Sequence, residues 1–351
     1  MQAPTRMSID AVRAPVYYVD NTPSTLDVAA SLLADTTIPT PHLTTIIADR
    51  QSAGRGRLGR SWVTPPGQAL LASTIVSLPV SLPADALGWI VHACALSVRE
   101  ALATRLEPLG HAVSLKWPND VLVDGARKIC GILAQLAPAS SPFTTAAILG
   151  YGVNIGQERA ILPTAQATSL AAEGDQSAGE DPTGVAHELL GQILAGLDRR
   201  ISSLVRHGDA MSAGLLAEAE AALEAADRVV LQFPMYWYST PALLKQWEDD
   251  VLLYGWAYGS TGNALAGKEL LVAVSVGGAG SAYGREGAHI YTIHEFLRPM
   301  QGTSRVIGTK YAVPFLSVGA LEITDEAIAG RAHDYAAVLQ TPELPLLDIF
   351  G

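Results

Sequence analysis

The sequence is poor in cysteine and in basic residues. Cys94 and Cys130 are its two cysteines, and they are far apart without metal-type spacing, which excludes a disulfide framework and a clustered zinc site. Lys and Arg number 23 against 34 Asp and Glu, for a formal net charge of −11. The chain therefore has no overall positive field that would attract a nucleic acid.

Long hydrophobic runs are also absent. No run approaches 18 apolar residues, and the first stretch, MQAPTRMSIDAVRAP, has no apolar signal-peptide core, so neither membrane spanning nor secretion is supported. These features predict a cytoplasmic protein with no membrane and no nucleic-acid partner. What is present is length and apolar content: 351 residues, of which 49% are hydrophobic, enough for two domains.

Hydrophobic spacing in the first half predicts an α+β fold. Helical spacing marks residues 24–34, 85–106 and 185–205, whereas residues 157–184 have the composition of a loop. The Asp124-Gly125 pair between two alternating runs predicts a hairpin, and hence antiparallel pairing. The strand-like runs are 43–49, 69–78, 113–117, 120–136 and 144–156. Together they predict a mixed sheet that carries helices.

From about residue 212 the pattern changes. Strand-like and helical segments alternate, which predicts parallel pairing in an α/β domain. A domain boundary is therefore expected at about residues 207–215. The expected helices are 215–226, 239–252, a segment near 295–300 and one near 325–340, and the expected strands are 227–233, 268–276 and 311–318.

Basic residues concentrate in one loop of the first half. The stretch from Arg50 to Arg60 has four arginines and three glycines, and Gly54, Gly56 and Gly59 spell G-x-G-x-x-G. A dinucleotide site needs a helix at that point and an acidic residue about 20 positions on. Pro65-Pro66-Gly67 stands there instead, and no acidic residue follows at that distance.

The loop could also be a solvated surface turn, an RNA-binding segment or a site for a small phosphate-bearing ligand. RNA binding would need more aromatic and basic residues than the neighbourhood of Trp62 supplies. A small phosphate-bearing ligand suits the residues better, because glycine permits close approach of the main chain and guanidinium groups bind phosphate or carboxylate through paired hydrogen bonds.

A set of motifs then narrows the interpretation. These are STLDVA (24–29), Gln51 with GRGRLGRSW (54–62), KWPNDVLV (116–123), ARKICGILAQL (126–136) and GYGVNIG (150–156). In order and spacing they resemble the catalytic domain of biotin protein ligase, over residues 16–206. The resemblance implies a class II synthetase-like core with a largely antiparallel sheet. It also implies that biotin and ATP with Mg²⁺ form biotinyl-5′-AMP, which then biotinylates a lysine of a biotin carboxyl-carrier domain.

The resemblance assigns roles by position. Lys128 aligns with the catalytic lysine, and Arg57 and Arg60 align with loop arginines that form and retain the adenylate. Asp120 is the residue expected to position Mg²⁺. The residues expected at biotin are Ser24, Thr25, Gln51, Arg55, Gly131 and Gly152. Those expected at ATP are Gly54, Gly56, Arg57, Trp62, Lys116, Asn119 and Asn154.

Simpler structural roles stay open for several of these residues. Lys128 follows a hairpin turn and would be solvated there, Asp120 and Asn119 suit turn caps, and Trp62 suits a core position. The chain also departs from the family. Leu26 stands where the family usually has Asn. Neither the small SH3-like domain that normally follows the core nor an N-terminal winged helix-turn-helix is recognisable, so a repressor role is not expected.

The second half resembles flavodoxin-like NAD(P)H:quinone reductases over residues 215–342. The matching segments are LQFPMYWYSTPALLKQWEDDVL (231–252), WAYG (256–259), SVGGAGSAYGREGAH (275–289) and RPMQGTSRVIGTKYAVPF (298–315). The resemblance implies that a flavin, FAD or FMN, would lie against one set of residues: Pro234, Tyr236, Trp237, Tyr238, Gly277, Gly278, Tyr283 and His289. Because members of this family commonly dimerise, the resemblance also implies a homodimer as a possible partner arrangement. The alternative role for the aromatic residues of this set is packing in the hydrophobic core.

The family's first βαβ unit, with its phosphate-binding loop, does not precede residue 215. The sequence thus predicts an incomplete flavodoxin-like domain with a weakened flavin site. Three functions follow for the whole chain: a biotin–carrier-protein ligase, a flavin-dependent quinone oxidoreductase, and a biotin- or adenylate-binding module without turnover.

Overall fold

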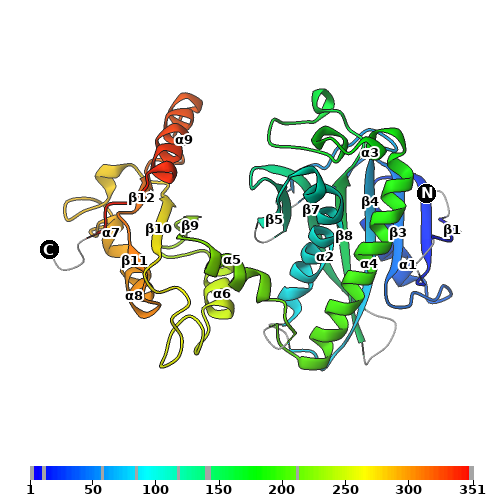
Figure 1. Cartoon of the computed structure of the whole chain (residues 1–351), viewed down its shortest axis with the longest axis horizontal. Coiled ribbons are helices and arrows are strands. Elements are labelled where there is room, and N and C mark those ends of the chain that lie inside the picture. The colour runs from blue at the N-terminus through cyan, green and yellow to red at the C-terminus, as the bar shows by residue number, and fades with distance from the viewer. Residues whose placement is uncertain are drawn as a thin grey trace. The chain divides into compact units, whose positions relative to one another are not determined.

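A computed structural model describes residues 4–9, 13–56, 59–83, 86–116, 119–138, 144–210 and 213–347. The chain divides into two compact units, Met1–Leu215 and Leu216–Gly351 (Figure 1).

The first unit is built on an eight-stranded sheet with the order β1-β2-β3-β4-β8-β7-β6-β5. All neighbouring strands pair antiparallel except β2 and β3, which are parallel. The strands are β1 (Thr5–Met7), β2 (Val16–Thr22), β3 (Thr44–Gln51), β4 (Ala69–Pro79), β5 (Val113–Lys116), β6 (Asp120–Val123), β7 (Arg127–Pro138) and β8 (Thr144–Asn154). The mixed, largely antiparallel sheet expected from the sequence is confirmed, with β1 and β2 as additions that were not predicted.

Helices cover this sheet. They are α1 (Thr25–Ala34), α2 (Trp89–Leu106), α3 (Gln176–Glu180) and α4 (Pro182–His207). The core cluster under α1 includes Leu26, Ile46 and Ile148, all 4% exposed or less. In Figure 1, α2 and α4 lie in front of the sheet, and they pack on each other. The segment Ala86–Leu109 is long and apolar enough to cross a membrane, but 72% of its most apolar window is buried inside the structure.

Local chemistry explains most element ends. Ser24 caps α1 by accepting a hydrogen bond from the Leu26 N–H. Asp124 and Gly125 both have positive φ, 49° and 67°, which is the conformation of the predicted hairpin turn. The segment 157–184, expected as a loop, is in part helical. Its last residues begin α4, because Asp181 caps the helix and Pro182 occupies its first turn.

The second unit has a parallel sheet. Its strands are β9 (Arg228–Pro234), β10 (Glu269–Ser275), β11 (Lys310–Tyr311) and β12 (Phe315–Ser317). β10 pairs with β9 over its full length, and with β11 and β12 in succession along its other edge. The predicted strand 311–318 is interrupted because Pro314 has no N–H to donate. Among the residues that the structure describes, β9 pairs with β10 alone.

Helices of this unit pack mainly on one face of the sheet. They are α5 (Ala217–Ala225), α6 (Ala242–Val251), α7 (Ile293–Phe296), α8 (Arg298–Val306) and α9 (Asp325–Gln340). Ile293, Leu297 and Met300 join the core on that face with Val272 and Val274 of β10. The helix α9 has no buried residue, but its partly buried Tyr335 and Val338 pack against Leu271 and Ala312 on the other face. The parallel α/β arrangement expected from the sequence is confirmed.

Candidate functional site

The arginine-glycine loop closes as a narrow hairpin. The Gly56 N–H donates to the Arg60 carbonyl at 2.7 Å, and the Trp62 N–H donates to the Gly54 carbonyl at 2.8 Å. A Cβ atom on Gly54 would lie 2.4 Å from the Trp62 carbonyl oxygen, so this pairing requires glycine. Arg57, the loop arginine expected to retain an adenylate, lies outside the described residues.

Two adjacent cavities open beside this hairpin. The first has a volume of about 50 Å³ and the second about 400 Å³. Gly56, Trp62, Asn119 and Lys128 line both cavities, so they form the boundary between them. The first cavity is also lined by Ser24, Thr25, Leu26, Gln51, Arg55, Ala72, Gly131, Ile132, Leu133, Gly150, Tyr151 and Gly152. The second is also lined by Arg60, Ser61, Val63, Asp120, Asn154, Pro163, Thr164, Gln166 and Ala167.

Polar side chains gather at one end of the first cavity. The Thr25 N–H donates to Gln51 Oε1 at 2.7 Å, and the Thr25 hydroxyl donates to the same oxygen at 3.1 Å. The Thr25 and Ser73 hydroxyls lie 2.8 Å apart. Because Gln51 Oε1 already accepts these bonds, its amide nitrogen is the end that can donate to a ligand. This end suits a compact ligand with both donors and acceptors.

Leu26 occupies the position that departs from the family pattern. Its side chain is 4% exposed and packs against Gly150, where a Cβ would lie 2.9 Å from the leucine. The departure therefore turns a polar position into an apolar wall of the first cavity.

Trp62 lies against two glycines that line the first cavity. A Cβ on Gly152 would lie 2.5 Å from the indole, and a Cβ on Gly131 would lie 3.2 Å from it. The two glycines thus form a groove in the sheet that accepts a flat ring. The indole Nε1 is buried and has no hydrogen-bond partner among the described residues. Ligand pockets usually measure about 300–1,000 Å³, so the first cavity can admit a ligand only after the indole moves.

Lys128 lies where the two cavities meet. Its Nζ is 2.6 Å from Oδ1 of Asp120, and 5.6 Å from the centre of the Trp62 ring. About a third of the lysine side chain and a fifth of the aspartate side chain are exposed, at 35% and 20%. The structure therefore joins the candidate catalytic lysine and the candidate metal ligand in one ion pair beside the second cavity.

The other predicted residues of this site either line a cavity or lie outside both cavities. Arg60 lines the second cavity, and Arg55 pairs with Asp27 at 2.6 Å. Asn119 Nδ2 donates to the Ile132 carbonyl, and Asn154 Nδ2 donates to the Thr168 carbonyl, both at 2.9 Å. Lys116 is exposed and lines neither cavity. It stands opposite Asp120 in the β5–β6 pairing.

Sequence reasoning missed part of both walls. Tyr151 lines the first cavity, and its hydroxyl lies 3.0 Å from the Thr74 hydroxyl. Burial raises the pKa of Tyr151, so it stays neutral. Its position inside GYGVNIG was an available signal. Residues 163–167 of the second wall carry no motif. They pair with β7, since the Lys128 N–H donates to the Gln166 carbonyl at 2.6 Å.

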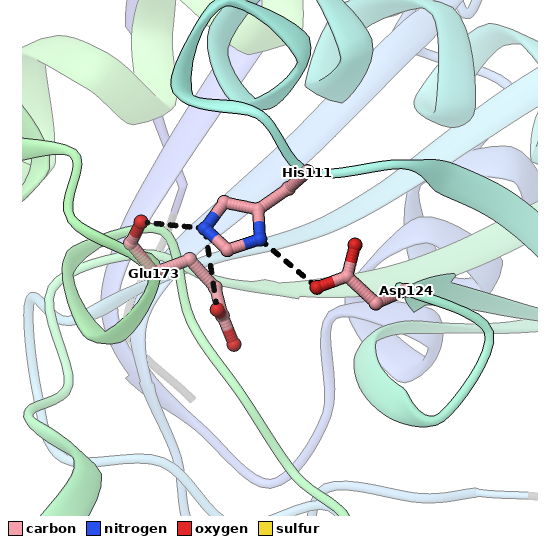
Figure 2. A group of neighbouring side chains, drawn as sticks. All are labelled: His111, Asp124 and Glu173. Atoms are coloured by element: carbon pink, nitrogen blue, oxygen red, sulfur yellow. Dashed lines mark hydrogen bonds and ion pairs between the residues drawn. The ribbon is translucent and has the colours of Figure 1, made fainter.

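Figure 2 shows a third grouping, in which Asp124 and Glu173 lie on either side of the His111 ring. Their ligand atoms fall within 4.8 Å of one another, as metal ligands would. However, Arg127 donates to Asp124 Oδ2 at 2.7 Å and to both Glu173 oxygens at 2.7 and 2.9 Å. Since Arg127 pairs with both carboxylates and Arg159 also pairs with Glu173, the described contacts form an ion-pair network that leaves a cation little advantage at this grouping.

The second unit gathers the expected ring-side residues at the ends of its strands. The Tyr238 hydroxyl lies 3.2 Å from His289 Nδ1, and the Tyr283 and His289 rings are 4.6 Å apart. A Cβ on Gly278 would lie 3.4 Å from the Tyr283 ring. Gly277 and Gly278 come directly after Val276, which follows the last residue of β10.

A strained turn follows Pro234 in this unit. Tyr236 and Ser239 exchange two backbone hydrogen bonds of 3.0 Å, which closes the turn. Trp237 and Tyr238 at its tip have φ values of 49° and 65°, a conformation that is costly for bulky residues. Trp237 is 93% exposed, so core packing does not explain this residue.

Comparisons with known proteins match two families to successive parts of the chain. Residues 18–154 match the biotin/lipoate A/B protein ligase family, and residues 172–339 match a family with the flavodoxin-like fold. The second match begins inside the first unit, whose last residue is Leu215.

Relatives were found for both parts. General stress protein 14 of Bacillus subtilis strain 168 is 48% identical over 127 residues, which are 36% of this chain and 73% of that protein. The uncharacterized NAD(P)H oxidoreductase YrkL of the same bacterium is 51% identical over 107 residues, which are 30% of this chain and 62% of that protein. A solved structure of biotin protein ligase from Aquifex aeolicus, in complex with biotin and ATP, is 27% identical to this chain. The match covers 54% of this chain and 73% of the ligase chain, with a TM-score of 0.39.

Proposed function

Residues 18–154 of this chain match the biotin/lipoate A/B protein ligase family and residues 172–339 match a family with the flavodoxin-like fold, and on that premise we propose that the chain is a biotin–carrier-protein ligase. It would join biotin to ATP as biotinyl-5′-AMP and pass the biotin to a carrier-domain lysine, in the cytoplasm. The observation that carries the proposal is Lys128 at the boundary of the two cavities, beside a loop rich in arginine.

In this proposal the first cavity takes biotin. The Thr25–Gln51 pair stands at its polar end, and Leu26 and Gly150 supply an apolar wall. Trp62 must leave the groove between Gly131 and Gly152 before the bicyclic ring can enter. The same indole can then cover the occupied site and exclude water from a reactive anhydride.

ATP would occupy the second cavity, with its α-phosphate near Lys128. The lysine would stabilise the negative charge that grows as the biotin carboxylate attacks phosphorus and pyrophosphate departs. Asp120 is the one carboxylate among the described residues that line this cavity, and Mg²⁺ commonly takes one or two carboxylates together with substrate phosphates. The donor set therefore fits Mg²⁺, which would offset the charge of the triphosphate. Arg60 and Arg57 would hold the adenylate from the loop.

The test is ATP-dependent transfer of labelled biotin to a biotin carboxyl-carrier domain by the whole chain. We expect transfer, and we expect Lys128→Ala to reduce its rate by about 10²–10³-fold. Lys310→Ala, at an exposed residue of β11 in the second unit, is the matched control and should leave the rate unchanged. A folded preparation that transfers no biotin would contradict the proposal and favour a binding module without turnover.

The second candidate function is a flavin-dependent quinone oxidoreductase. What favours it is the group of Tyr238, Tyr283 and His289, which has the character of a flavin-side surface. The sheet beside this group argues against it. We propose that this unit binds flavin weakly or not at all, because β9 has no second neighbour among the described strands, and the family's first strand and phosphate loop would belong there. The whole chain should be incubated with FMN or FAD and then desalted. Stoichiometric flavin retention with NAD(P)H-dependent quinone reduction would establish an oxidoreductase instead.

A further inference from the structure

Glu173 is the centre of the ion-pair network beside the second cavity. It ends the 3-10 helix Ala171–Glu173, and its side chain is 3% exposed. Arg127 binds it with two hydrogen bonds, from Nε to Oε1 at 2.7 Å and from Nη2 to Oε2 at 2.9 Å. Arg159 donates at 3.1 Å and the Thr168 hydroxyl donates to Oε1. Such a bidentate pair fixes orientation as well as charge.

The two main partners of Glu173 flank the pairing that forms the cavity wall. Arg127 directly precedes Lys128 on β7, and Thr168 directly follows Ala167. Between them, the Lys128 N–H donates to the Gln166 carbonyl at 2.6 Å, and the Thr168 N–H donates to the Lys128 carbonyl at 2.9 Å. One carboxylate therefore holds both sides of the short parallel pairing between Lys128 and Ala167.

We infer that Glu173 is a positioning residue for the nucleotide cavity: through Arg127 and Thr168 it sets the place of residues 163–167 against Lys128. The inference rests on the proposed ligase function. It concerns the second cavity alone, because residues 163–167 do not line the first. Glu173 itself lines neither cavity, so its effect on ligands is transmitted through the wall.

Loss of the carboxylate should loosen this wall. In Glu173→Gln the side chain keeps its size, but it loses its charge and one of its two acceptor oxygens. The Arg127 guanidinium, 27% exposed, would then keep its bond to Asp124 but lack its bidentate partner, and loss of one partner of such a pair is unfavourable. Glu173→Asp keeps the charge and should restore part of the function.

The chain offers a matched control in Glu100. This glutamate on α2 also pairs with two arginines, Arg199 at 3.1 Å and Arg200 at 2.9 Å, and it lines neither cavity. Glu100→Gln therefore removes an acceptor that also pairs with two arginines from the same unit without touching the wall, at a more exposed position, 47% against 3%.

Two measurements on the whole chain test the inference. The first is hydrogen exchange without ligands, in which Glu173→Gln should accelerate exchange of the Lys128 and Thr168 amides about tenfold or more, and Glu100→Gln should not. The second is the ligation assay, in which Glu173→Gln should raise KM for ATP about tenfold and leave KM for biotin within about twofold.

The outcomes separate the inference from the function on which it rests. Unchanged exchange at Lys128 and Thr168 would overturn the positioning role whatever the ligation assay gives. Equal rises in KM for ATP and for biotin would overturn it too, since they indicate a general loss of structure. Accelerated exchange in a chain that never ligates biotin would support the positioning role and contradict the proposed function alone.

Discussion

The ammonium group of Lys128 lies 2.6 Å from a carboxylate oxygen of Asp120, across the β6–β7 hairpin. The pairing satisfies both charges at the edge of a 400 Å³ cavity. In the proposed function, a triphosphate with its cation would exchange these partners: the lysine would pair with phosphate, and the aspartate would hold the metal. Without substrates, the ion pair keeps each group beside the other.

Removal of the aspartate charge should weaken the binding of Mg²⁺ during ligation. In Asp120→Asn, Lys128 is free to meet phosphate, but the cavity loses its carboxylate for Mg²⁺. We expect the Mg²⁺ concentration for half-maximal ligation to rise about tenfold, since each carboxylate is a main determinant of Mg²⁺ binding. The rate should be measured across a Mg²⁺ titration. An unchanged midpoint would remove Asp120 from the metal site, and Asp198→Asn, on α4, serves as control.

A methyl group in the glycine groove should displace Trp62. Gly152→Ala places a Cβ 2.5 Å from the indole, and such overpacking costs about 1–3 kcal/mol of unfolding free energy. Acrylamide should then quench the tryptophan fluorescence more strongly, and the increase should disappear in a Trp62→Phe background. Gly302→Ala, at a position with nothing within 4 Å, should change neither property. Equal quenching in Gly152→Ala and the unmodified chain would place the indole elsewhere in solution.

Truncation of the loop arginine should weaken retention of the intermediate. Arg57→Ala removes a guanidinium that the motif assigns to the adenylate, so biotinyl-5′-AMP should leave about tenfold faster. Release of labelled adenylate from the whole chain measures this rate. Arg50→Ala, earlier in the same basic stretch, is the comparison. Identical release from both variants would argue against a clamp at residue 57.

Asp124 and Glu173 should make the stability of the first unit depend on pH. The hydrogen bond with His111 and those from the Ala112 N–H and Arg127 lower the pKa of Asp124 to about 2. Burial opposes ionisation of Glu173, but hydrogen bonds from Arg127 and Thr168 outweigh it and lower the pKa. Since both pKa values are depressed by folding, the stabilisation is complete above the ordinary carboxyl pKa, about 4, and is lost as the pH falls toward 2.

Urea unfolding from about pH 6 to about pH 3 measures this dependence. The free energy of unfolding should fall toward the acid end, and less steeply in Glu173→Gln, which has one titrating carboxyl fewer. Parallel curves for the two proteins would show that Glu173 does not contribute to the slope.

Local sequence signals predicted the elements better than the site. Ser24, the Asp124-Gly125 turn and the alternating runs gave α1, the β6–β7 hairpin and the sheet, because caps, turns and periodicity act over a few residues. β2 was missed although its VYYV run is β-branched and aromatic. Residues 163–167 were missed because their pairing with β7 depends on Glu173 and Arg127, 46 residues apart, and no local pattern records such a contact.

The motifs placed Lys128, Asp120, Thr25 and Gln51 around adjacent cavities, but they gave no warning that Trp62 lies in the glycine groove. That position follows from the absence of side chains at Gly131 and Gly152, on two different strands. Lys116 shows the reverse limit. Its motif places it near phosphate, whereas the hairpin leaves it exposed.

The second unit is thin for a parallel sheet, which usually needs cover on both faces. β9 has one neighbour among the described strands, and the cluster under α9, formed by Leu271, Ala312 and Leu344 with the partly buried Tyr335 and Val338, is small. A unit with so small a second core should have a lower melting enthalpy than the first unit. In a calorimeter the chain should therefore show two heat-absorption peaks, the smaller and cooler one from residues 216–351, so that the first unit stays folded at temperatures that unfold the second.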